Sequence, residues 1–198
     1  MILMEVKGML TLEQKNNNEI RFMELLTKLN IDLTEVNKLL DQADYFNKPA
    51  STQYMCAYPG GLCEYALRTA HELGVLCNAY FPGRYTEEDV IKVALFKDFY
   101  KATMYEMYMK NVKNDSTGQW ESVPAYKTIE GSNRPVFGDV RFSSYMQLKS
   151  LIQFTDEQIE AIVNSGPSDY TPDIHDIYRA YPLVVLTRMA ELAAMYIS

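Results

Sequence analysis

Residues that bind metals or form disulfides are scarce in this chain. Its 198 residues include two histidines and three cysteines. The cysteines are an odd number and form no CxxC or CxxH pair: Cys56, Cys63 and Cys77. This pattern argues against a zinc ribbon and against a disulfide-stapled secreted scaffold. It favours reduced, inert thiols in a cytoplasmic compartment.

The sequence also lacks long apolar runs and an excess of positive charge. No segment approaches the length that spans a membrane, and the N-terminal MILMEVKGMLTLEQ has no basic start followed by an apolar stretch. Basic residues number 19 against 26 acidic ones, which gives a net charge of -7. We therefore expect neither export nor membrane binding, and no direct binding of duplex nucleic acid.

What remains is the composition of an ordinary globular domain. Apolar residues make up 47% of the chain and charged residues 23%, and the length suffices for a core without disulfides. Tyrosines and methionines are unusually many, at 15 and 11. Both residue types are common in adaptable cores and at protein interfaces, so the composition favours a binding role.

Helical periodicity recurs along most of the chain. Apolar residues at i, i+3 and i+4, together with capping residues, predict helices at 16–30, 32–44, 61–79, 86–110, 142–154, 155–163 and 182–198. Residues 1–50 should form N-terminal helices that pack on a core domain at 51–198. In the helix at 86–110, the inward stripe of Val90, Val93 and Ala94 continues onto Lys97 and Asp98.

Two segments break this pattern. Between 112 and 135, the turn sequence NDSTG and the alternating QWESVPAYKTIE predict a small β-hairpin around Trp120. Farther on, SDYTPDIHDIYRAY predicts an acidic, tyrosine-rich loop, where Asp173, His175 and Asp176 could form a metal site. The other histidine, His71, should face solvent. The fold class is therefore an all-α bundle with a small β-hairpin insertion.

Five ordered segments carry a resemblance to a known family. They read YPGGLCEYAL, ALFKDFYK, FGDVRFSSYMQL, FTDEQIEAIVNSG and YPLVVLTRMAELAA, with GQWESVPAYKT between the second and third. Together they resemble the HD-domain superfamily of metal-dependent phosphohydrolases, especially its small phage-encoded members. The resemblance covers roughly 55–198. It implies an HD-like helical bundle in which a bound metal lowers the pKa of an attacking water.

The departures from the family pattern fall on its metal ligands. The family's metal-binding histidines fall on Tyr65 and Lys97, and its aspartates on Asp98 and Glu191. Its auxiliary histidines fall near Val140 and on Asn164, and its histidine before the last acid falls on Arg188. The vestigial site is thus Tyr65, Lys97, Asp98, Asn164, Arg188 and Glu191. Only Asp98 is kept, so the resemblance implies no catalytic residues, no bound metal and no cofactor.

These substitutions suggest that side-chain cations have replaced the metal. Lys97 and Arg188 could pair with Asp98 and Glu191 in a neutral cluster, while Tyr65 fills the vacated space. Buried unpaired charges are costly, so pairing is expected. Replacing Lys97 by methionine should cost about 3–5 kcal/mol if the cluster is dry and far less if it is wet.

Three functions are compatible with this interpretation. The first is an HD-fold pseudoenzyme that binds a protein partner or a second copy of itself, as a viral accessory or regulatory protein in the host cytoplasm. The second is a module that holds the phosphate of a nucleotide with Lys97, Lys101 and Arg188. The third is a residual phosphohydrolase with magnesium on Asp98, Glu191 and loop carboxylates. The first is the function that we expect.

Overall fold

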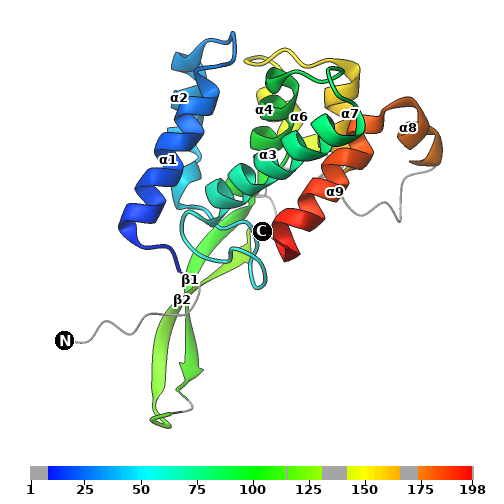
Figure 1. The fold of residues 1–198 in the computed structure, drawn as a ribbon. Helices are drawn as coiled ribbons and strands as arrows, with labels where there is room; N and C mark the ends of the chain where they lie inside the picture. The colour runs from blue at the N-terminus through cyan, green and yellow to red at the C-terminus, as the bar shows by residue number, and fades with distance from the viewer. Residues whose placement is uncertain (1–8, 115, 131–141, 166–173, 198) are drawn as a thin grey trace.

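The computed structural model describes residues 9–114, 116–130, 142–165 and 174–197. These residues form a mainly helical body from which a single two-stranded antiparallel sheet extends (Figure 1). The predicted all-α class with a small hairpin is therefore confirmed. No helix in the described ranges has the length and hydrophobicity to cross a membrane.

The N-terminal helices are α1 (Leu12–Leu26) and α2 (Leu33–Gln42), followed by the short 3-10 helix η1 (Tyr45–Asn47). Helix α1 begins four residues before the predicted start. Thr11 and Gln14 form a capping box there, which satisfies the first free N–H groups of the helix. Asp32 caps α2 by accepting a hydrogen bond from the Thr34 N–H.

Helix α3 (Gly61–Tyr80) matches its predicted range to within one residue. It begins after Gly60, whose φ of +84° lies in the left-handed region that favours glycine. A Cβ on Gly61 would lie 2.1 Å from the Cys56 carbonyl oxygen, so only glycine fits where the preceding loop meets the helix. The two glycines therefore fix the entry of the chain into α3.

The predicted helix at 86–110 is wrong in its last part. Helix α4 (Glu87–Phe96) and the short α5 (Tyr100–Met104) are followed by a strand, β1 (Tyr105–Lys113), which pairs with β2 (Trp120–Thr128). The hairpin thus begins seven residues before its predicted start at 112. The acidic first turn correctly marks the start of α4, but it carries no information about where the helix ends.

The C-terminal half contains α6 (Ser143–Leu148), α7 (Asp156–Asn164), α8 (Ile174–Ala180) and α9 (Pro182–Tyr196). The Thr155/Gln158 capping box of α7 and the start of α9 at Pro182 are as predicted. Helix α6 is shorter than the range 142–154. The predicted loop around His175 is wrong, because that residue lies on α8.

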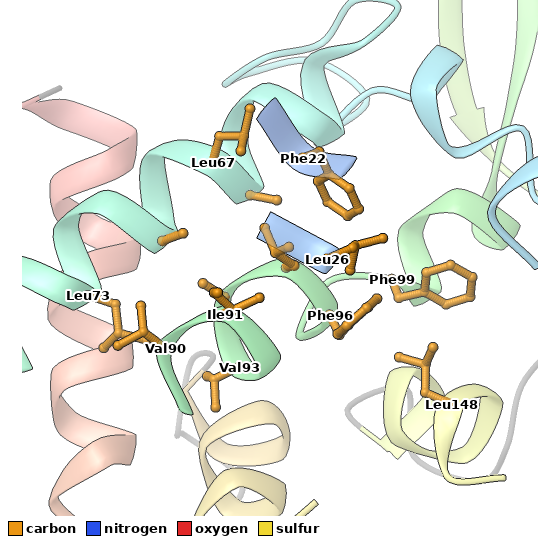
Figure 2. Close-up of a cluster of buried hydrophobic side chains, with 14 of the residues drawn as sticks. Phe22, Leu26, Leu67, Leu73, Val90, Ile91, Val93, Phe96, Phe99 and Leu148 are labelled. Carbon is orange, nitrogen blue, oxygen red and sulfur yellow. The ribbon is translucent and has the colours of Figure 1, made fainter. Parts of the chain in front are cut away.

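The main apolar cluster joins these elements, and a smaller one surrounds Tyr65. Figure 2 shows Phe22 and Leu26 of α1 beside Ile91 and Phe96 of α4, with Leu148 of α6 nearby. All five side chains are buried. The N-terminal helices therefore pack on the same core as the rest of the chain, as predicted, and α3 packs against both α4 and α9.

Candidate functional site

Three segments bring the predicted site residues together. Tyr65 comes from the first turns of α3, Lys97 and Asp98 follow the end of α4, and Glu191 lies in the middle of α9. Lys97 has the helical φ of -57°, so the inward face of α4 continues onto it. Because α3 packs against both α4 and α9, these side chains meet in the interior.

Ion pairs connect the charged members of the site. Lys97 Nζ lies 2.5 Å from Asp98 Oδ2 and 3.3 Å from Glu191 Oε1. Lys101 Nζ lies 2.9 Å from Asp98 Oδ1, and Arg188 Nη1 lies 3.0 Å from Glu191 Oε2. We call these five residues the charge cluster. Lys97 bridges its two carboxylates, and each carboxylate has a further cation of its own.

The charge cluster is largely shielded from solvent and carries an excess of positive charge. The Lys97 side chain is 4% exposed, whereas that of Arg188 is 30% exposed. Three cations face two carboxylates, which leaves one net positive charge where two of each sign were predicted. The additional cation is Lys101. The three-residue spacing from Asp98 to Lys101 on a helical stretch could have indicated this pair.

The electrostatic environment keeps the pairs ionised. Burial alone would lower the pKa of Lys97, but Asp98 and Glu191 outweigh burial and raise it above its usual range. Burial likewise favours the neutral form of Asp98, yet Lys101 and Lys97 hold its pKa well below the usual carboxylate value. Lys97 is therefore a fixed positive charge at neutral pH, and Asp98 a fixed negative one.

Tyr65 forms one wall of the charge cluster. Its ring centroid lies 5.4 Å from Lys97 Nζ and 5.3 Å from Lys101 Nζ, within the range of cation–π attraction. The side chain is buried, and its hydroxyl, though close to Glu191, makes no hydrogen bond of regular geometry with any described residue. Burial, followed by Asp98 and Glu191, raises the pKa of Tyr65, so the phenol stays protonated.

This arrangement does not fit a divalent metal. The resemblance to HD-domain proteins would place a metal near these carboxylates, but here the Lys97 ammonium lies between Asp98 and Glu191. Across the described ranges, no three histidine, cysteine, aspartate or glutamate side chains are placed to hold a metal. Charged lysine and arginine cannot act as ligands.

Among the remaining predicted positions, those that the structure describes do not join the charge cluster. Asn164, at the end of α7, is buried and donates a hydrogen bond to Glu160 Oε2 at 2.5 Å. Val140 and Asp173 lie outside the described residues. His175 is exposed on α8, and its neighbour Asp176 pairs with Arg179. The metal site suggested by the spacing of Asp173, His175 and Asp176 includes a residue outside the described ranges, so it stays a prediction.

Ser144 of α6 stabilises the segment that carries Lys97 and Asp98, and sequence analysis did not identify it. Its hydroxyl donates to the Lys97 carbonyl oxygen at 2.8 Å and accepts from the Tyr100 N–H at 3.0 Å. It thereby holds the turn between α4 and α5, which carries Lys97 and Asp98. A serine in a polar segment has no pattern that would reveal this contact before the fold is known.

The histidine and cysteine side chains elsewhere show no reactive arrangement. His71 is exposed, as predicted, and lines a cavity of about 630 Å³ between α1, α3 and α4. The three thiols are free and buried. Burial raises the pKa of Cys77 to about 12 and moves the pKa of Cys56 in the same direction, so neither forms a thiolate nucleophile at neutral pH.

The hairpin presents a second candidate site. It extends away from the helices (Figure 1), and Met107, Met109 and Trp120 are 62%, 58% and 71% exposed. Opposite residues in an antiparallel pair share a face, and the register places these three on one face together with Pro124. The other face carries the Lys127–Glu106 ion pair at 3.0 Å.

We call the face with Met107, Met109, Trp120 and Pro124 the apolar hairpin face. Sequence analysis missed it because residues 105–110 were assigned to a helix. The sequence YEMYMK at 105–110 has Tyr105, Met107 and Met109 at every second position, a spacing that could have indicated a strand instead. No family model matches the chain, and no curated protein or solved structure matches it either.

Proposed function

We propose that the chain is a non-catalytic HD-like protein that acts by binding a protein partner. The observation that carries this proposal is the position of Lys97 Nζ between the Asp98 and Glu191 carboxylates. A divalent cation at this place would meet a fixed ammonium charge. At 4 Å and an effective dielectric constant of about 20, each unit of like charge costs about 4 kcal/mol.

The arrangement of the cluster also removes the means of activating water. Hydrolysis of the HD type needs a metal to lower the pKa of a bound water. The two carboxylates that could contribute to such a site are engaged by Lys97, Lys101 and Arg188. Tyr65 stays protonated and is buried, so it offers no nucleophile in place of the water.

The apolar hairpin face is the surface that best supports protein binding. An isolated two-stranded ribbon is marginally stable in water, so one that exposes Met107, Met109 and Trp120 gains from a partner. Tryptophan and methionine are enriched in the buried centres of protein interfaces. The same residues have no evident role in stabilising the helical body, from which the hairpin projects (Figure 1).

The excess positive charge of the cluster supports a second candidate function, the binding of an anionic ligand. Arg188 is its most exposed member, and a guanidinium can bind phosphate through two parallel hydrogen bonds. Such a ligand would neutralise the net charge without being cleaved. A nucleotide phosphate is the ligand that we would test first.

Two assays separate these functions. Nucleotides and p-nitrophenyl phosphate are offered with magnesium or manganese to the wild type and to Asp98→Ala. We expect no turnover by the wild type above that of the variant, and turnover that depends on Asp98 would contradict the proposal.

The second assay follows the thermal midpoint with inorganic phosphate and a nucleotide panel, because a ligand that binds only the folded state raises it. An unchanged midpoint favours protein binding. A rise that is lost in Arg188→Leu would instead establish the anion-binding function.

A further inference from the structure

The hydrogen-bond pattern of the hairpin shows which backbone groups face outward. The Asn114 N–H donates to the Gln119 carbonyl oxygen at 2.8 Å, and the Ile129 N–H donates to the Met104 carbonyl oxygen at 2.9 Å. Both are therefore hydrogen-bonded pairs at the two ends of the hairpin ladder. In an antiparallel ladder, bonded and non-bonded pairs alternate. Even-numbered residues of β1 therefore bond to β2. Met107, Met109 and Asn111 direct their N–H and C=O groups away from it.

The two outer edges of the hairpin differ in their capacity to pair. Pro124 stands opposite Met109, at an outward-facing position of β2, and it has no N–H to donate. Strand β1 contains no proline. Within the described ranges, no further strand pairs with either edge. The edge of β1 is therefore the better template for an added strand.

Side chains on the same edge favour such an addition. Met107 and Met109 lie on the apolar hairpin face, so a strand added at β1 would widen that face. Three or more strands with an apolar face are stable where a two-stranded ribbon is marginal. Proline, one natural protection of an edge strand, is absent from β1, and Lys110 is the one charged residue at 107–111.

We propose that β1 pairs in antiparallel fashion with β1 of a second copy of this chain, forming a four-stranded sheet. This inference rests on the proposed protein-binding function and names the partner. A two-fold axis at Met109 keeps the outward-facing residues opposite one another. Met109 then faces its own copy and Met107 faces Asn111 of the second copy.

This register avoids contacts between like charges and pairs a cation with an aromatic ring. With the axis at Met109, Tyr108 faces Lys110 of the second copy, where the ammonium can contact the aromatic ring. Glu106 faces Val112 of the second copy, so no like charges stand directly opposite each other along the pair. A register that placed Lys110 opposite itself would bring two cations together.

The size of the contact sets the expected strength. A nine-residue strand is about 30 Å long and a two-stranded ribbon about 10 Å wide, so stacking the apolar faces would bury only about 300 Å² per copy. A stable interface needs about 800 Å² per partner. Stacking of two apolar hairpin faces is therefore too small to hold a stable dimer, so main-chain hydrogen bonds along β1 must contribute. We expect the resulting dimer to be reversible and to depend on protein concentration.

Sedimentation equilibrium of the full chain tests the proposal. From about 1 μM to about 500 μM, a range that brackets weak and moderate interfaces, the mass should rise from 22.8 kDa towards twice that value. Asn111→Pro removes one outward-facing N–H of β1 and should abolish dimerisation. Ser122→Pro is the matched control, since Ser122 stands opposite Asn111 on the other edge and its substitution should leave the dimer intact.

The other outcomes contradict the proposal. A monomer at all concentrations excludes the second copy as partner, and equal effects of the two proline variants exclude the β1 edge. Should Asn111→Pro fail to fold, oxidation of Met109→Cys provides a second measurement. A residue on the axis should give a disulfide-linked dimer, and a Ser122→Cys control should not. Failure here would leave the hydrolysis and ligand assays unaffected, so the two proposals can fail separately.

Discussion

At the scale of single residues, Lys97 holds the charge cluster together because it contacts both carboxylates. The cost of removing it depends on what the carboxylates retain. Asp98 keeps Lys101 and Glu191 keeps Arg188, so neither becomes an isolated buried charge. This additional pairing lowers the cost that the sequence alone suggested for Lys97→Met.

We therefore expect Lys97→Met to lower the free energy of unfolding by about 1.5–3 kcal/mol, the loss of a charged hydrogen-bonding group. Combining it with Lys101→Met leaves Asp98 without a cation, and that loss should reach about 3–5 kcal/mol. Urea denaturation of both single variants and the double variant measures the coupling. Strictly additive losses would show that the two lysines do not share Asp98.

Asp98 also predicts how stability changes with pH. Its folded-state pKa is depressed, so its contribution is full above the unfolded pKa of about 4 and is lost as the pH falls towards the folded value. Lys97 has a raised pKa, so its contribution is full below about pH 10.4 and declines above it.

Urea denaturation along a pH series should therefore show a plateau with two declining limbs. The acid limb should flatten in Asp98→Asn, which no longer titrates at this position. An acid limb equally steep in the wild type and the variant would mean that the cluster pairs do not stabilise the fold.

At the scale of elements, the starts of α3 and α7 were predictable and strand β1 was not. Gly60 and Gly61 mark the start of α3, and the capping box of Thr155 and Gln158 marks the start of α7. Both signals are local in the sequence. The end of α4 and the strand that follows depend on pairing with β2, a contact that helix periodicity does not contain. The convergence of Lys97 and Glu191 was expected only through the resemblance, because helix periodicity does not contain the packing of α3 against α9.

The glycines of α3 offer a test with an internal control. Gly61→Ala would place its Cβ 2.1 Å from the Cys56 carbonyl oxygen, so the entry loop must shift and stability should fall by about 1–3 kcal/mol or more. Gly74 lies in the same helix, and a Cβ there would make only ordinary contact with Val90 of α4, so Gly74→Ala should gain about 0.5–1 kcal/mol. Thermal unfolding of both variants should therefore shift in opposite directions.

At the scale of the whole molecule, the main apolar cluster holds the N-terminal helices and the helices around the charge cluster together. We propose that side-chain cations occupy the place where the resemblance to HD-domain proteins would put a metal. The chain as a whole has a net charge of -7 and would attract cations nonspecifically. A test must therefore distinguish a metal bound at this site from cations bound elsewhere on the surface.

The most direct measurement is the metal content of protein that is produced in medium with manganese and purified without chelator, determined by elemental analysis per chain. Asp98→Ala serves as the matched control. The charge-cluster account predicts less than about one tenth of an equivalent in the wild type, since a cation would meet the fixed ammonium of Lys97. Close to one metal per chain in the wild type, lost in Asp98→Ala, would contradict it.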